Sequence, residues 1–158
     1  MTVVSDTSPI LYLLLIDQID LLPRLYQTII IPDVVQAEMQ ADGAPATLRN
    51  WISAPPDWLE ITPVPEGDYT RLSRLQSGEQ AAIVLARFLR ANLLIVDDLD
   101  ARNIAQSLGL EIIGMLGILG EAARRNWIDF PSVLNQLLQE TNFRISPQLA
   151  KSLLEQFS

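Results

Sequence analysis

Leu93-Leu94-Ile95-Val96-Asp97-Asp98 is an apolar run that ends in two adjacent carboxylates. A short run that is apolar throughout is typical of an inner strand of a parallel sheet, buried on both faces. Residues 99–108 then have the apolar spacing of a helix, and Gly109 is a residue type that commonly ends one. We therefore expect the two aspartates at the carboxyl edge of a parallel sheet, where open α/β sheets bind their ligands. The local alternative is that Asp98 caps the helix and Asp97 sits in the turn.

Four more short apolar or β-branched segments alternate with helical segments along the chain. Strands are predicted at 3–5, 28–31, 59–62, 93–96 and 111–113. Helices are predicted at 10–16, 19–26, 33–40, 46–53, 68–75, 81–91, 99–108, 115–126, 130–140 and 147–157. This alternation predicts an α/β fold, a doubly wound, mostly parallel five-stranded sheet flanked by helices. We expect one domain, with a core over residues 1–130 and a C-terminal helical appendage over 131–158.

Two of the predicted helices begin with recognisable signals. Ser8 followed by Pro9 has the form of an N-cap residue with proline at the first helical position. Ser77, with Gln80 three residues later, has the form of a capping box. The second signal places Glu79 in the first turn of its helix.

The composition excludes several classes of chemistry. The 158 residues include no cysteine and no histidine, and Lys151 is the one lysine. Disulfides, Cys/His zinc sites, thiolate nucleophiles and imidazole bases are therefore excluded. P-loop and Schiff-base chemistry lack their central lysine. A reaction at this protein would have to rest on carboxylates, hydroxyls, arginines or a hard metal ion.

Charge and hydropathy bear on the partners. The net charge of −8 is unusual for a nucleic-acid binder, although carboxylates that hold divalent cations have their charge offset locally. The hydrophobic fraction of 49% and the mean hydropathy of +0.21 favour a buried oligomer interface, and a generous core explains them almost as well. No apolar run reaches the roughly 18 residues that cross a bilayer, and no basic segment precedes the N-terminal apolar stretch. We expect a cytoplasmic protein without membrane association.

Acidic residues from separate parts of the chain are expected to meet at one edge of the sheet. Asp6 follows the first strand as Asp97 and Asp98 follow the fourth, while Glu38 and Glu79 lie beside the apolar stripes of their helices. Each has a local alternative: a turn for Asp6, a solvated flank for Glu38 and the helix dipole for Glu79. Carboxylates packed into one crevice repel one another unless cations are present. Oxygen ligands select Mg²⁺ or Mn²⁺, which suit phosphodiester hydrolysis.

These acids also carry a family resemblance. The segments SDTSP at 5–9, IPDVV at 31–35 followed by Glu38, GEQA at 78–81 and VDD at 96–98 occur in the order and spacing of PIN domains. The likeness extends through LGL at 108–110 and IGMLG at 113–117, and the chain most resembles a bacterial PIN-like group related to VapC-type toxins. The resemblance implies an endoribonuclease of toxin–antitoxin type that uses Mg²⁺ or Mn²⁺. RNA, a cognate antitoxin and a second copy of the chain are then the expected partners.

The resemblance also implies roles for individual residues. Asp6, Glu38, Glu79 and Asp98 stand at the positions of the family's catalytic acids. Asp6, Glu79 and Asp98 would hold the metal ion, and Asp97 is the alternative ligand at the end of the fourth strand.

Two positions depart from the usual family pattern. Val96 stands where a hydroxyl residue is usual, so either of the next two aspartates could be the ligand, and we favour Asp98. Glu79 stands where aspartate is commoner, and its longer side chain would shift the metal. Thr7 or Ser8 resembles the family's hydroxyl that contacts the scissile phosphate or the metal-bound water, although we favour helix capping as the role of Ser8.

Two other functions remain open at this point. A PIN-fold module could bind RNA or a protein and cleave poorly, with phosphate contacts from arginines that equally suit an ordinary surface. These arginines are Arg71, Arg74, Arg87, Arg90, Arg102, Arg124 and Arg125. A phospho-receiver domain also places aspartates at a sheet edge, but it needs a lysine after the fifth strand, where Gly114 stands.

Overall fold

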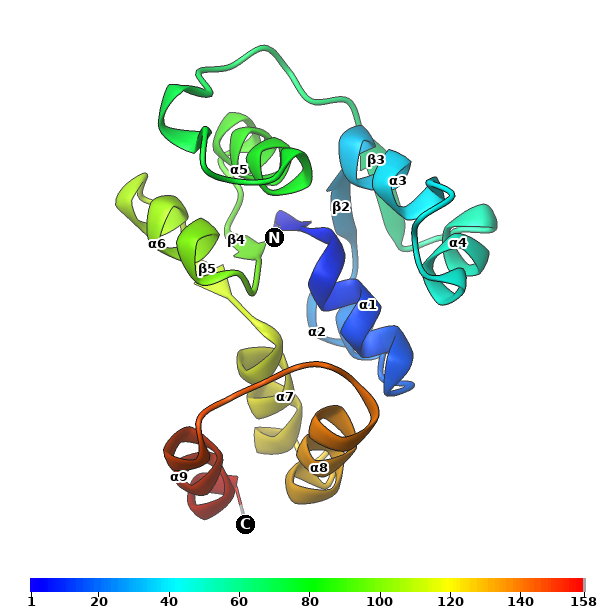
Figure 1. The fold of residues 1–158 in the computed structure, drawn as a ribbon, viewed down its shortest axis with the longest axis vertical. Coiled ribbons are helices and arrows are strands. Elements are labelled where there is room, and N and C mark those ends of the chain that lie inside the picture. The colour runs from blue at the N-terminus through cyan, green and yellow to red at the C-terminus, as the bar shows by residue number, and fades with distance from the viewer. Residues whose placement is uncertain (158) are drawn as a thin grey trace.

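Five parallel strands form the centre of the molecule, with helices on both faces (Figure 1). The structure is a computed structural model that describes residues 1–157. The strands are β1 (Val3–Ser5), β2 (Ile29–Pro32), β3 (Leu59–Thr62), β4 (Leu93–Ile95) and β5 (Ile112–Ile113). Their order in the sheet is β3-β2-β1-β4-β5, and every neighbouring pair is parallel. The predicted doubly wound α/β fold is confirmed.

The strand order places a topological switch point between β1 and β4. From β1 the chain moves outward through β2 and β3, and it then returns to pair β4 with the other side of β1. Val3 pairs with Leu93 and Ser5 with Ile95, so the two strands end level with each other. Ligands of open α/β sheets bind outside the carboxyl ends of the strands at such a point. The order differs from the 2-1-3-4-5 order of receiver domains, so the receiver alternative is wrong.

Helices connect the strands and cover both faces of the sheet (Figure 1). They are α1 (Thr7–Leu15), α2 (Leu21–Tyr26), α3 (Asp33–Gln40), α4 (Ala46–Ser53), α5 (Ser77–Leu89), α6 (Leu99–Ser107), α7 (Met115–Arg124), α8 (Phe130–Glu140) and α9 (Pro147–Phe157). The helix predicted at 68–75 is wrong except for the short 3₁₀ turn η1 (Thr70–Leu72). Leu72 and Leu75 are the buried residues of that stretch, which is too few for the apolar stripe of a helix.

Alternating strand residues divide the core between the two faces of the sheet. Val3 and Ile95 face one cluster, which takes in buried residues of α1, α2, α3, α4, α7 and α8. Val4, Leu94 and Val96 face the other cluster, which takes in buried residues of α5 and α6. β1 and β4 are therefore buried on both sides, as the continuous apolar run at 93–96 predicts.

The last two helices are attached to the core in different ways. α8 contributes Phe130, Leu134 and Leu137 to the first cluster, whereas α9 has no buried residue within its described length. The rings of Phe130 and Phe157 lie 4.6 Å apart and join the two helices. The division of the chain at residue 130 stays a prediction. None of the helices formed by residues 1–157 is long and apolar enough to cross a bilayer.

Candidate active site

Asp6 occupies the point where β1 gives way to α1. Its backbone N–H donates to the carbonyl oxygen of Ile95 at 3.0 Å, which ties it to β4. Asp6 is the N-cap residue of α1, so the expectation that Ser8 caps this helix is wrong. Pro9 lies in the first turn, where its missing N–H leaves no hydrogen bond unmade. Asp6 is only 5% exposed although it carries a carboxyl group.

The electrostatics of Asp6 show which acids surround it. The pKa of the Asp6 carboxyl is raised from an ordinary value of 3.8 to about 7, and burial is the largest cause. The Thr7 backbone N–H lowers this pKa, and the negative charges of Glu79, Glu38 and Asp97 contribute to the rise. Three other carboxylates, each from a different part of the chain, therefore lie near enough to Asp6 to influence its charge.

Glu38 is the acid that α3 brings to this edge of the sheet, and we call the region of Asp6, Glu38, Glu79, Asp97 and Asp98 the acidic crevice. The Thr7 hydroxyl donates to Glu38 Oε2 at 3.0 Å, which holds the glutamate beside the residue that follows Asp6. Its carboxylate packs directly on the backbone of Gly78, where a Cβ would lie 2.7 Å from Glu38 Oε2. Any larger residue at 78 would push the glutamate away. In the sequence, the only signal of this close approach is the glycine that precedes Glu79.

Glu79 is held at the start of α5 by a capping box. The box is formed by Gln76 and Glu79, with the Gln76 backbone N–H donating to Glu79 Oε1 at 3.1 Å. The predicted box, Ser77 with Gln80, is therefore shifted by one residue. Gln80 instead donates to two carbonyl groups of the connection before the helix. Burial raises the pKa of Glu79, the Gln76 backbone N–H lowers it, and the charges of Asp98 and Glu38 contribute to the rise, so Glu79 lies near both acids.

Asp98 is the N-cap residue of α6. Its Oδ2 accepts a hydrogen bond from the Ala101 N–H at 3.0 Å, so the local capping role foreseen for it is confirmed. The same side chain lies near Glu79, whose pKa it raises. Capping and membership of the acidic group therefore occur together at this residue.

Asp97 faces the start of α7. Its Oδ1 accepts from the Met115 N–H at 2.8 Å, and a Cβ at Gly114 would lie 2.6 Å from that oxygen. Its Oδ2 is buried and has no hydrogen-bond partner among residues 1–157. Burial raises the pKa of Asp97, while the Met115 N–H and the Arg102 guanidinium lower it.

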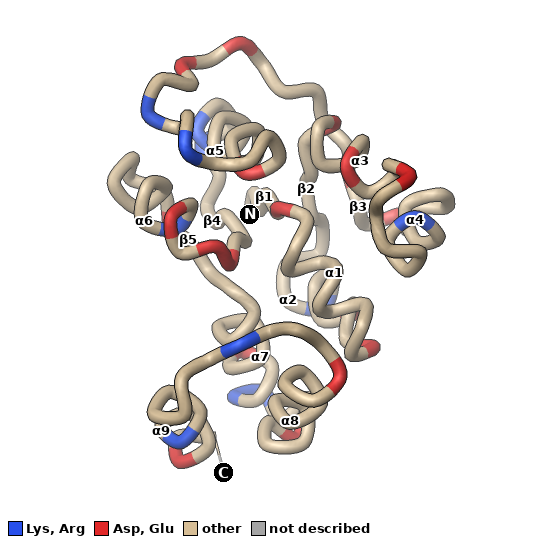
Figure 2. The backbone as a smooth tube through the Cα atoms, viewed as in Figure 1, with Lys and Arg blue, Asp and Glu red and all other residues tan. Residues whose placement is uncertain are grey.

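The acids meet at one edge of the sheet but do not form a finished cage. Figure 2 shows acidic positions near the starts of α1, α5 and α6, which face one another around the switch point. Glu38, Glu79 and Asp97 each lie near enough to raise the pKa of Asp6, and Asp98 lies near enough to raise the pKa of Glu79. Within the described residues, no three Asp or Glu side chains are placed closely enough to hold a metal ion as they stand.

The hydroxyls of Thr7 and Ser8 are placed differently. Thr7 donates to Glu38, whereas Ser8 is exposed and lines a hollow of about 290 Å³. The other lining residues are Tyr12, Asp97, Asp98, Asn142, Phe143 and Arg144. Sequence reasoning did not find Tyr12 or the segment 142–144. Nothing in their local pattern signals a site, because a distant part of the chain brings them to the edge of the sheet.

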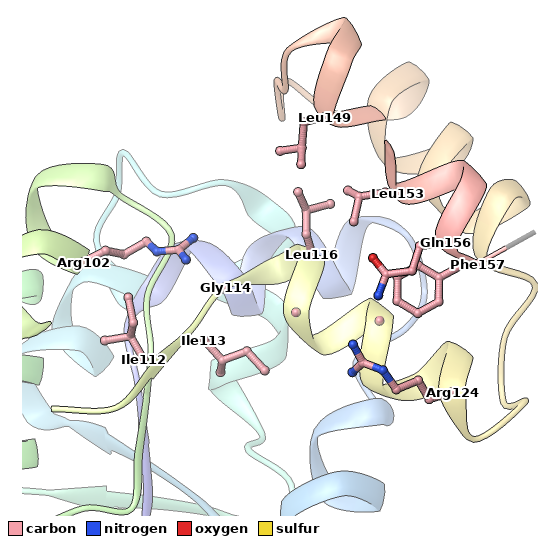
Figure 3. Close-up of a pocket in the computed structure, with 12 residues that line it drawn as sticks. Arg102, Ile112, Ile113, Gly114, Leu116, Arg124, Leu149, Leu153, Gln156 and Phe157 are labelled. Atoms are coloured by element: carbon pink, nitrogen blue, oxygen red, sulfur yellow. The ribbon is translucent and has the colours of Figure 1, made fainter. Parts of the chain in front are cut away.

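A separate hollow of about 380 Å³ lies between β5, α7 and α9 (Figure 3). Leu116, Leu149 and Leu153 point toward one another across it, and Arg102 and Arg124 stand at its sides. None of the acids discussed above lines this hollow, so we place the candidate active site at the acidic crevice.

The comparisons with known proteins agree with the fold. A family model described as DUF3368: PIN domain matches residues 2–158 of the chain. No curated protein and no solved structure gives a significant match.

Proposed function

Because the chain belongs to the PIN-domain family, whose fold is of nuclease type, we propose that it is a metal-dependent endoribonuclease. Its active site would be the acidic crevice at the carboxyl ends of β1 and β4. We further propose that it cleaves RNA as a toxin of the VapC-related kind, which places its activity in the cytoplasm.

The observation that carries this proposal is the environment of Asp6. A carboxyl group that is 5% exposed and under the influence of three other carboxylates is costly to keep in the ionised form. A fold gains nothing in stability from such an arrangement. A divalent cation would offset the repulsion, so the cluster is better explained as a site for one.

The donor chemistry of the crevice fits a hard divalent ion. All the candidate ligands are carboxylate oxygens, which is the set that Mg²⁺ and Mn²⁺ prefer. Asp97 Oδ2 is buried without a hydrogen-bond partner among the described residues, so it has a free lone pair to offer. We assign the ion to Asp6, Glu79 and Asp98, with Asp97 as the alternative ligand. When bound, the ion would polarise the scissile phosphate and make a water molecule more acidic.

The remaining residues would orient the substrate and the acids. Glu38, the fourth catalytic acid of the proposal, is fixed by the Thr7 hydroxyl and by the backbone of Gly78. Ser8 is exposed beside the aspartates and would donate its hydroxyl proton to a phosphate oxygen. Asp6 would exchange its proton for the ion, so ion binding should strengthen as the pH rises through 7.

The test combines cleavage with an ion-binding measurement that does not depend on activity. Wild type, Asp6→Asn and Asp98→Asn are incubated with labelled RNA in Mn²⁺ or in EDTA, and their melting temperatures are recorded with and without Mn²⁺. We expect Mn²⁺-dependent cleavage and a Mn²⁺-induced rise in Tm for wild type, and a large loss of both for the two variants. Asp57→Asn, which removes an exposed negative charge from a loop, is the matched control.

The outcomes separate the proposal from its alternative. Cleavage that persists unchanged in both variants, or in EDTA, would remove the metal-dependent nuclease. RNA that is bound but never cleaved would favour a binding module with the same fold. That alternative draws support from the present spacing of the acids, which do not form a closed set of ligands.

The partners of the proposal are a cognate antitoxin and a second copy of the chain. Their candidate surface is the hollow of Figure 3 together with α9, where Leu149 and Leu154 are exposed. Light scattering of the purified chain tests the dimer directly. A monomer at micromolar concentration would remove that part of the proposal and leave the nuclease intact.

A further inference from the structure

The connection between α8 and α9, residues 141–146, is anchored to α1 beside the acidic crevice. The Tyr12 hydroxyl donates to Asn142 Oδ1 at 2.9 Å. The Tyr12 and Phe143 rings pack edge to face, with their centroids 5.2 Å apart. Because α1 begins directly after Asp6, these contacts hold the connection against the helix that the buried acid caps.

Arg144 is the basic residue of this connection (Figure 2). Its Nη1 donates to the carbonyl oxygens of Thr141 and Phe143 at 3.2 and 3.0 Å, which fixes one corner of the guanidinium. Among residues 1–157, the one ion pair with nitrogen and oxygen atoms within 4.0 Å is that of Arg124 with Glu121. Among these residues, Arg144 therefore has no carboxylate in contact that would neutralise its charge. Its side chain is exposed.

Arg144 nevertheless lines the same 290 Å³ hollow as Ser8, Asp97 and Asp98. Its effect on Tyr12 agrees with this placement. Burial is the main cause that raises the pKa of Tyr12, the charge of Asp97 raises it further, and the charge of Arg144 lowers it. Charges of both signs therefore border the hollow at the edge of the proposed active site.

We propose that Arg144 is a substrate-positioning residue that binds a backbone phosphate of single-stranded RNA next to the phosphate at the acidic crevice. The inference rests on the proposed function and adds where the RNA strand runs. A polyanion is repelled by a chain with a net charge of −8, and an unneutralised cation beside the acids offsets that repulsion where the strand must pass. A guanidinium with free donors suits phosphate oxygens. Within the described residues, Arg144 donates hydrogen bonds through Nη1 and not through Nε or Nη2.

The test measures RNA affinity at several salt concentrations, separately from cleavage. Fluorescence anisotropy of a labelled single-stranded RNA is recorded in Ca²⁺ for wild type, Arg144→Gln, Arg144→Lys and Arg49→Gln. Loss of one phosphate contact should weaken binding about fivefold to tenfold and reduce the slope of log K against log salt by about 0.7. Arg144→Lys should keep the wild-type slope because the charge remains.

Arg49→Gln is the matched control. Arg49 is exposed and also donates to a backbone carbonyl, that of Ala44 at 3.1 Å, but it lies on α4 and lines none of the hollows described above. The inference would be overturned if Arg144→Gln had the same salt slope as wild type, or if Arg49→Gln reduced the slope as much as Arg144→Gln does. A wild type that binds no RNA would also overturn it. Failure of the proposed function looks different: the wild type binds RNA with an Arg144-dependent slope and does not cleave it in Mn²⁺.

Discussion

Replacing Asp6 by asparagine should make the metal-free protein more stable, although most substitutions of buried residues do the opposite. Asparagine has nearly the same shape and keeps an oxygen that can accept the Thr7 N–H. It removes a charge that is destabilised by burial and by the negative charges of Glu79, Glu38 and Asp97. The gain in folding free energy should depend on pH. The wild-type fold is destabilised only at pH values where the Asp6 carboxyl of the unfolded chain is ionised.

The sign and size of the effect follow from the two pKa values of Asp6. Its pKa is 3.8 when unperturbed and about 7 in the fold. Below pH 3.8 the group is protonated in both states, so the fold has no penalty. Between 3.8 and 7 the unfolded chain ionises first and the fold loses relative stability, and above 7 the loss is complete. A difference of about 3 in pKa corresponds to about 4 kcal/mol, which is an upper limit on the gain for Asp6→Asn.

The assay is urea unfolding of wild type and Asp6→Asn in EDTA over a range of pH. We expect equal stability near pH 4 and an advantage for Asp6→Asn that grows to a plateau near pH 8. A gain of this size would raise Tm by roughly 10 °C in a chain of this length. Asp57→Asn removes an exposed charge and should show no comparable trend.

One result would refute the reasoning. If Asp6→Asn is no more stable than wild type near pH 8, the carboxylate is not confined among like charges, and the crevice is open to water. Adding Mn²⁺ gives the converse measurement, because an ion that binds wild type should reduce or reverse the advantage of the variant.

Three further predictions test individual contacts. Gly78→Ala should lower RNA cleavage at least about tenfold, because the added Cβ displaces Glu38. The free energy of unfolding should change by no more than about 1 kcal/mol. A fully active variant would show that catalysis does not need Glu38 in this position. Asp98→Asn should keep the cap bond to Ala101 and its stability while losing activity, whereas Asp98→Ala should lose about 1 kcal/mol as well, as thermal melts will show. Gly114→Ala should destabilise the fold, because its Cβ clashes with Asp97. In a double-mutant cycle, adding Asp97→Ala should recover part of the lost unfolding free energy. Additive changes in unfolding free energy would contradict the contact between the two residues.

The strands and their order along the chain could be predicted because each one is defined locally. The run at 93–96 is apolar throughout since β4 is buried on both faces, and the β-branched residues before Pro32 mark β2 in the same way. Paired acids after β4 and a single acid after β1 then fall at one edge by topology alone. The spatial order of the strands could not be read from the sequence, because it depends on packing between segments far apart in the chain.

Helix starts were predicted less well because several residue types compete for the same cap. Ser8 and Ser77 are good N-cap residues, yet Asp6 and Gln76 take these positions. In both cases the helix begins earlier than the pattern suggests. The stretch at 68–75 forms only a short 3₁₀ turn where a helix is predicted, because it lacks the buried stripe that would hold a helix against the sheet.

An acid at this edge of the sheet can cap a helix and also belong to the acidic crevice. Asp98 caps α6 and faces Glu79, and Glu79 forms a capping box and faces Asp98 and Glu38. Each carboxylate thus uses one oxygen to hold its own helix start in place, and the helix in turn fixes the carboxylate at the edge of the sheet. Because backbone groups hold the acids, their mutual repulsion cannot simply swing them apart into solvent. The fold therefore fixes several acids at one edge of the sheet before any ion arrives, which reduces the reorganisation that the cation site we propose would need.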